Sequence, residues 1–134
     1  FDLTYVRNPG GVWSVGAGLD GPLRTAVFLA LPIAITGFAI WYSWMLPAKA
    51  LGRQSAIALV VGGALGNLFD RVFRNPPEVV DFFLAHFRER YWPAFNVADS
   101  AICVGVGILL VASFLEDDEE EQPSAPPPAD GAAR

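Results

Sequence analysis

The sequence contains few charged residues and very few cysteine and histidine residues. Only 17% of its 134 residues are Asp, Glu, Lys or Arg, and it holds one cysteine and one histidine. The single cysteine, Cys103, excludes an intrachain disulfide. The single histidine, His86, has no second ligand at helical spacing, which argues against a metal site. The chain also lacks a Gly-rich phosphate loop, residues that would activate a serine nucleophile, and a basic patch. We therefore expect no cofactor and no nucleic-acid partner.

Long apolar runs take the place of the missing charge. Apolar residues make up 53% of the chain, a share typical of small membrane proteins. Residues 25–48 and 54–69 carry no charge, and 96–115 carry a single carboxylate. A helix needs about 20 mostly apolar residues to cross a bilayer. The sequence thus predicts an all-α membrane protein, a transmembrane helical bundle with three spans present.

Short segments outside these runs predict a small β element. Residues 3–6 and 12–15 have the composition of strands and flank the turn-forming residues 8–11. Residues 79–82 predict another short strand, and 83–90 an interfacial helix.

The net charge of −5 belongs to the C-terminal end of the chain. Residues 116–134 hold seven acidic residues and one arginine, so residues 1–115 sum to +1. An acidic, Pro-rich segment with few large apolar residues cannot build a core. The sequence therefore predicts a membrane-embedded domain over 1–115 and a disordered tail over 116–134.

One carboxylate, Asp99, stands near the start of the third span. Ionisable groups in membrane segments are costly and usually face an interior or a wet cavity, which makes Asp99 a functional candidate. Aspartate also caps helices, and the residue alone does not decide between the two roles. Asn96 and Ser100 share its end of the helix and extend a polar stripe there.

Two further aspartates fall on the same side of the predicted membrane. Asp81 follows two valines and precedes two phenylalanines, so its setting is apolar. Asp70 shares a helix face with Asn67 and is followed by Arg71, which favours an ion-paired structural role.

A pair formed by Asp99 and Asp81 has a definite chemistry. Two carboxylates in one apolar site cannot readily both ionise, so they share a proton. One can then activate water while the other protonates a leaving group, as in aspartic proteases. A hard metal ion is the alternative ligand of such a pair.

Four segments resemble the motifs of signal peptidase II, the bacterial lipoprotein signal peptidase, an integral-membrane aspartic protease. They are Asn8–Ser14 (NPGGVWS), Gly62–Arg71 (GGALGNLFDR), Val79–Phe82 (VVDF) and Phe95–Ser100 (FNVADS). The resemblance implies that Asp81 and Asp99 are the catalytic pair. The residues that it implies to line or support the site are Asn8, Asn67, Asp70, Arg71 and Asn96.

The same resemblance implies a substrate and a location. The family removes signal peptides by cleaving before a diacylglyceryl-modified cysteine, at the outer face of the bacterial cytoplasmic membrane, without a metal. It is inhibited by the cyclic peptide globomycin. Its members have four membrane helices with both termini cytoplasmic, so a further helix is expected before Phe1. This places 71–95 outside and the tail inside, although counting arginines in the loops favours the opposite orientation.

Two other interpretations of the sequence remain open. The chain is compatible with a non-enzymatic membrane protein that uses its aspartates to handle ions or protons, and with an inactive fragment of the protease. The aromatic residues of the second loop are expected either to cover the site or to anchor the loop in the membrane. They are Phe82, Phe83, His86, Tyr91 and Trp92.

Overall fold

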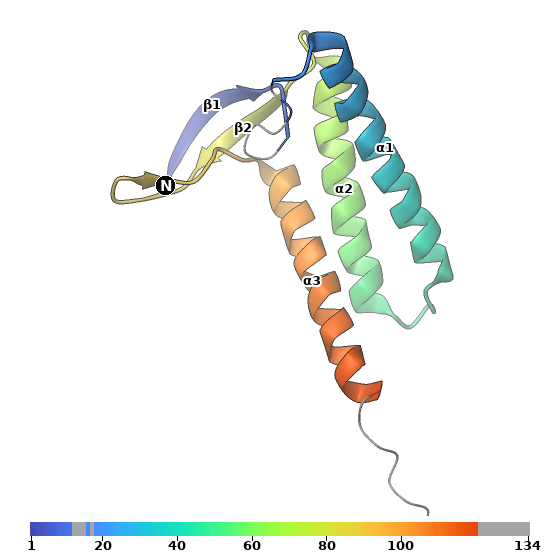
Figure 1. Cartoon of the computed structure of the whole chain (residues 1–134). Coiled ribbons are helices and arrows are strands. Elements are labelled where there is room, and N and C mark those ends of the chain that lie inside the picture. Colours follow the sequence, from blue (N-terminus) through green and yellow to red (C-terminus); the bar gives the residue numbers. More distant parts are fainter. Residues whose placement is uncertain (12–15, 17, 121–134) are drawn as a thin grey trace, which may run out of the picture.

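The computed structural model describes residues 1–11, 16 and 18–120. Its three long helices are α1 (Gly21–Met45), α2 (Leu51–Phe73) and α3 (Val97–Glu120). They run side by side in alternating directions (Figure 1), and each is long and apolar enough to cross a membrane. This confirms the predicted helical membrane bundle.

Helix α2 is the central element of the bundle, because both α1 and α3 pack against it. Apart from Arg71, its buried residues are small or apolar and include Ala56, Ile57 and Ala64. Most large apolar side chains of α1 and α3 are instead exposed at the surface. Such a distribution suits helices that are solvated by lipid, where close packing of small residues drives helix association.

Two glycines let α2 and α3 approach closely. A Cβ atom added at Gly63 would overlap the carbonyl oxygen of Ala98 and lie 2.7 Å from Ile102 Cγ1. Further along α3, a Cβ atom at Gly105 would lie 2.6 Å from the carbonyl oxygen of Ala56. The first of these contacts lies beside the start of α3, where Asp99 stands.

A two-stranded antiparallel sheet projects from one end of the bundle (Figure 1). Strand β1 (Asp2–Asn8) pairs with β2 (Val79–Leu84), and Val6 lies opposite Asp81 in the register. The strands predicted near 3–6 and 79–82 are thus confirmed and pair with each other. The strand predicted over 12–15 lies outside the described residues.

The interfacial helix predicted over 83–90 is wrong. Strand β2 continues to Leu84, and a short hairpin of β3 (His86–Phe87) and β4 (Arg90–Tyr91) follows. The cause is long-range pairing, because the Phe83 N–H donates to the Phe95 carbonyl (2.8 Å) and the Phe95 N–H donates back (3.0 Å). These bonds hold the segment extended, whatever its local helix preference.

Several predicted helix ends also shift. Helix α2 is longer than the uncharged run 54–69, because its last turns include polar and charged residues. Helix α3 continues past residue 115 to Glu120, since glutamate has a high helix propensity. Residues 121–134 lie outside the described part of the chain, so disorder there stays a prediction.

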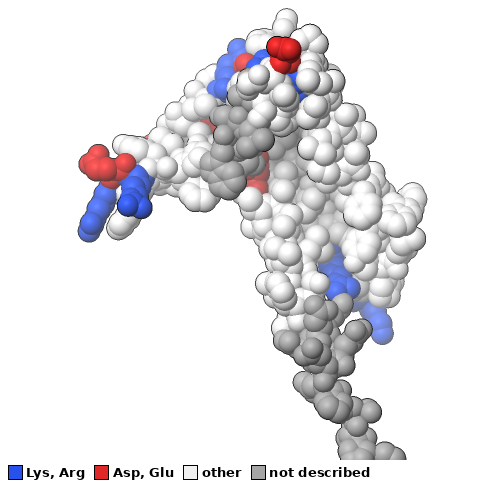
Figure 2. All heavy atoms as spheres, in the orientation of Figure 1, with Lys and Arg blue, Asp and Glu red and all other residues white. Residues whose placement is uncertain are grey.

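Charged side chains gather at the ends of the molecule. Figure 2 shows them at the sheet end of the helices, at the tip of the arm formed by the β1–β2 sheet and the β3–β4 hairpin, and at the opposite end of the helices. The helix surface between these ends is largely uncharged. Such banding is typical of a protein whose middle is embedded in hydrocarbon.

Candidate active site

Asp81 lies on β2, at the point where the sheet meets the helices. Its side chain is 2% exposed. Asn8 Nδ2 donates a hydrogen bond to its Oδ2 (3.0 Å), and Asn96 Nδ2 donates to its Oδ1 (2.7 Å). The strand pairing brings Asn8 there, because β1 ends next to β2. Both oxygens of this buried carboxyl group are therefore held by amide donors.

Asp99 occupies the first turn of α3 and both caps the helix and faces the site. The Asn96 N–H donates to Asp99 Oδ2 (3.1 Å), and the Asp99 N–H donates to Asn96 Oδ1 (3.0 Å). This reciprocal pair stabilises the start of the helix. Asn67 Nδ2 donates to the other oxygen of Asp99 (2.8 Å). The capping role that the sequence left open for Asp99 is thus observed, while its functional role stays a prediction.

Asn96 connects the two aspartates. Its amide nitrogen reaches both Asp81 Oδ1 and Asn67 Oδ1 (3.2 Å), while Asn67 holds Asp99. Asn96 is 5% exposed, so these bonds form away from bulk water, where they are strong and leaving one unmade is costly. Three separate segments are fixed to one another by a continuous chain of side-chain bonds.

Arg71 connects the segments around this network. It is 7% exposed, and its Nη2 donates to the Gly10 carbonyl (2.8 Å) and its Nη1 to the Asn67 carbonyl (3.3 Å). Its guanidinium carbon lies 5.3 Å from the centre of the Phe28 ring. Arg71 therefore ties the turn after β1 and helix α1 to α2.

Asp70 stands outside the pair and supports β2. Its Oδ2 accepts a hydrogen bond from the Val80 N–H (3.1 Å), next to Asp81, and its Oδ1 lies 3.0 Å from Arg74 Nε. The predicted structural role fits this position, but the ion pair forms with Arg74 rather than with Arg71.

The pKa of Asp81 is raised above its ordinary value. Burial is the main cause, since it penalises the charged form, and the negative charge of Asp99 adds to it. The amide donors of Asn8 and Asn96 and the charge of Arg71 act in the opposite direction without cancelling the effect of burial. Asp81 is therefore suited to carry a proton.

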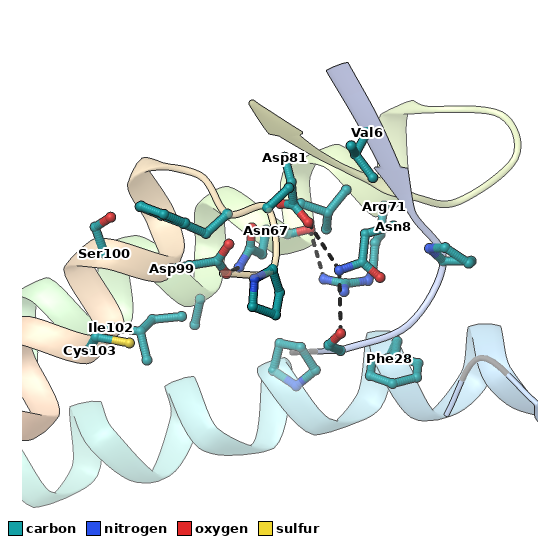
Figure 3. A pocket seen from close by; sticks show the side chains of 18 of the residues that line it. Val6, Asn8, Phe28, Asn67, Arg71, Asp81, Asp99, Ser100, Ile102 and Cys103 are labelled. Atoms are coloured by element: carbon teal, nitrogen blue, oxygen red, sulfur yellow. Dashed lines mark hydrogen bonds between the residues drawn. The ribbon is translucent and has the colours of Figure 1, made fainter. Parts of the chain in front are cut away.

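A cavity of about 580 Å³ opens beside the two aspartates. Figure 3 shows Asp81, Asn67 and Arg71 at its polar end, with Phe28 facing them from α1 and Ile102 and Cys103 further along α3. The rest of its α1 wall consists of Leu31, Pro32 and Ile35. Sequence reasoning missed this α1 wall, because apolar residues in a membrane helix carry no signal of which face lines a cavity.

The second loop contributes only part of what was expected. Trp92 lines the cavity, together with Pro93 and Phe95. Among the residues that line it, neither His86 nor Tyr91 is found. Instead His86 Nε2 lies 3.1 Å from Asp2 Oδ2, and its ring lies 5.5 Å from that of Tyr91, at the distal arm.

The donor set around the aspartates favours protons over a metal ion. Each oxygen of Asp81 and Asp99 already accepts an N–H donor, and a hard cation would compete with these donors for the same oxygens. Within the described residues no three His, Cys, Asp or Glu side chains converge.

Comparison with known proteins places this chain in a family. The family model for signal peptidase (SPase) II matches residues 1–115. A lipoprotein signal peptidase from Syntrophotalea carbinolica is 48% identical over 115 residues, which cover 85% of this chain and 68% of that protein. A lipoprotein signal peptidase from Actinobacillus succinogenes is 43% identical over 114 residues, with the same coverage.

Solved structures agree with the sequence comparison. One bacterial membrane enzyme superposes with a TM-score of 0.74 at 32% identity, covering 92% of this chain and 70% of its own. A second superposes with a TM-score of 0.67 at 33% identity, covering 83% and 67%. The chain therefore belongs to the signal peptidase II family and is a membrane-embedded peptidase.

Proposed function

We propose that this protein is an aspartic endopeptidase that removes signal peptides from prolipoproteins by cleaving before a diacylglyceryl-modified cysteine. The observation that carries the proposal is the pair Asp81 and Asp99, joined through Asn96 and Asn67 at the polar end of an apolar cavity. The catalytic pair and its supporting residues Asn8, Asn67, Asp70, Arg71 and Asn96 are the ones that the sequence predicts.

Catalysis would begin with one proton shared by the pair. Because burial raises the pKa of Asp81, we assign the proton to Asp81 and the negative charge to Asp99. Asp99 takes a proton from water, the hydroxide oxygen bonds to the scissile carbonyl carbon, and Asp81 gives its proton to the carbonyl oxygen. A neutral tetrahedral diol results. Asp99 then protonates the leaving nitrogen, and Asp81 recovers its proton from a diol hydroxyl as the carbon–nitrogen bond breaks.

The surrounding amides would hold the pair in place during these steps. Asn8, Asn67 and Asn96 donate to carboxylate oxygens at 2.7–3.0 Å, which fixes both carboxyl groups before substrate arrives. Preorganised polar groups in a water-poor site lower the barrier because they need no rearrangement during reaction.

The apolar part of the cavity suits the lipid of the substrate. Phe28, Leu31 and Ile35 line one side and Ile102 the other, and each buried CH₂ group contributes about 0.8 kcal/mol. Acyl chains and membrane lipids are thus the expected occupants of the apolar cavity, and a lipophilic cyclic peptide of the globomycin type would compete with the substrate for it.

The family resemblance supports an active site at the outer face of the bacterial cytoplasmic membrane. The connection between α1 and α2, at the end opposite the sheet, contains Lys49, and Arg53 follows in the first turn of α2. On the site side, Arg7 pairs with Glu78 (2.7 Å) and Arg74 with Asp70. The arginine count in the loops favours the opposite orientation whether or not the arginines pair with acidic residues, so the proposed location rests on the family resemblance.

The test is cleavage of a defined lipidated precursor by the purified chain in bilayers. Mass spectrometry should find a product that begins with the diacylglyceryl-cysteine, and the same precursor without lipid should be cleaved far more slowly. Cleavage at another bond, or equal rates with and without lipid, would contradict the proposed substrate.

A further inference from the structure

Pro32 lies inside α1, where it removes a helical hydrogen-bond donor. Proline has no N–H group, so the carbonyl of Phe28, four residues earlier, loses the donor that an α-helix normally supplies. Water is scarce at membrane depth, and a carbonyl without a donor is costly there. A donor from outside the helix can therefore satisfy the Phe28 carbonyl.

This carbonyl lies on the wall of the cavity. A helical carbonyl points along the axis toward the residue four positions later, here from Phe28 toward Pro32. Both residues line the cavity, so the carbonyl lies between them on the same wall. The Phe28 ring also stacks on Arg71 (Figure 3), which places this part of α1 opposite the polar end of the site.

Among the described residues, the α1 wall offers no polar side chain. The α1 residues that line the cavity, among those the structure describes, are Phe28, Leu31, Pro32 and Ile35, and all four side chains are apolar. Across the cavity, the oxygens of Asp81 and Asp99 already accept amide donors. A ligand with an N–H group that faces α1 thus has the Phe28 carbonyl as its acceptor.

A peptide substrate brings such N–H groups. Its scissile bond can reach the aspartates only if the chain around that bond is extended rather than helical, and its backbone N–H groups then need new acceptors. We propose that the Phe28 carbonyl, freed by Pro32, accepts a hydrogen bond from a backbone N–H of the bound peptide near the cleaved bond. This inference rests on the proposed function and adds a substrate-binding group to it, with Pro32 as the positioning residue.

The substitution Pro32→Ala tests the inference, because it restores the N–H group that closes the helix bond. We expect it to raise the melting temperature by at least about 2 °C. It should also weaken binding of a non-cleavable lipopeptide with a reduced scissile amide by roughly 3- to 10-fold, the worth of one hydrogen bond. Pro32→Ala should thus be more stable than the unchanged chain and bind the lipopeptide more weakly.

Pro22→Ala is the matched control on the same helix. Pro22 lies in the first turn of α1, where an N–H group has no helical acceptor, so its absence frees no carbonyl. This variant should bind the lipopeptide as the unchanged chain does. If Pro32→Ala binds as tightly as Pro22→Ala, the inference is overturned.

Methylated peptides identify the bond directly. N-methylation at one position near the reduced amide should weaken binding to the unchanged chain and leave binding to Pro32→Ala unaffected, because the acceptor is already occupied there. Equal losses in both proteins at every position would refute the inference. Binding is measured without turnover, so failure of the unchanged chain to cleave would count against the proposed function alone.

Discussion

Replacing Gly63 by alanine should move Asn67 away from Asp99, one of the two proposed catalytic residues, while leaving the fold intact. The new Cβ atom would lie 2.7 Å from Ile102 Cγ1 and overlap the Ala98 carbonyl. Carbon atoms in contact need at least about 3.5 Å, so α2 and α3 must move apart by roughly 0.8 Å at this level. Ala98 directly precedes Asp99, and Asn67 follows Gly63 by one turn of α2.

The expected loss of activity follows from that displacement. The bond from Asn67 Nδ2 to Asp99 Oδ1 measures 2.8 Å, and a shift of about 0.8 Å would lengthen it beyond hydrogen-bond range. Misplacing a reacting group by about 1 Å costs on the order of 100-fold in rate. We therefore expect kcat for a fluorogenic lipopeptide to fall by about 100-fold, with KM little changed.

Gly105→Ala supplies the control at the same helix interface. Its Cβ atom would lie 2.6 Å from the Ala56 carbonyl oxygen and 2.8 Å from Val60 Cγ2, so overpacking should destabilise both variants similarly, by about 1–3 kcal/mol. Position 105 lies about 9 Å further along α3 than Asp99, and kcat should stay within about threefold of the unchanged chain. Equal losses of kcat in the two variants, or an unaffected Gly63→Ala, would refute the reasoning.

Three further predictions follow from the contacts around the pair. Asn96→Ala removes the donor that joins Asp81 to Asn67 and should lower kcat by about 100- to 1,000-fold; a loss below tenfold in a steady-state assay would contradict this. Asp70→Asn keeps an oxygen that accepts the Val80 N–H and loses only an exposed ion pair, so the free energy of unfolding should change by at most about 1 kcal/mol. Asp70→Ala also removes that acceptor and should lower the free energy of unfolding by about 1–3 kcal/mol. Similar losses in both variants would show that the ion pair dominates. The raised pKa of Asp81 means that its contribution to stability is full below about pH 4, its unfolded value, and is lost as the pH rises through its folded pKa. Raising the pH from about 4 to about 7 should therefore lower the free energy of unfolding more in the unchanged chain than in Asp81→Asn. Equal changes in the two proteins would contradict the raised pKa of Asp81.

The helical bundle could be predicted from the sequence because membrane helices obey a simple rule. An uncharged run of sufficient length such as 25–48 must satisfy its backbone internally, and only a helix does so within one segment. The observed α1 begins four residues earlier, at Gly21, because its first turn needs neither apolar residues nor internal donors.

The β3–β4 hairpin and the pairing of β1 with β2 could not be predicted, because both depend on long-range contacts. Residues 83–90 contain no local pattern that specifies a strand pairing with residues near 95, yet the Phe83–Phe95 bonds decide their conformation. The pairing of β1 with β2 likewise joins segments more than 70 residues apart. That pairing brings Asn8 to Asp81, a contact that spacing alone does not imply.

Part of the site could be predicted from the sequence for a chemical reason. Asp81, Asp99 and Asn96 stand out because polar groups are rare and costly in an apolar chain. Phe28 and Pro32 carry no such signal, and only the position of α1 across the cavity reveals their role. The bridging function of Asn96 also required the structure, since it joins elements that are distant in sequence.

The most direct test of the aspartic pair compares Asp81→Asn and Asp99→Asn with the unchanged chain and with Asp70→Asn. Cleavage of a diacylglyceryl-modified prolipoprotein is followed in the presence of a chelator, with thermal unfolding as the check on folding. We predict that the unchanged chain cleaves, that Asp70→Asn retains most of its turnover, and that each of the other two variants is folded and inactive. Near-normal turnover by either Asp81→Asn or Asp99→Asn would contradict the catalytic pair, and loss of cleavage by the unchanged chain on chelation would contradict a metal-independent mechanism.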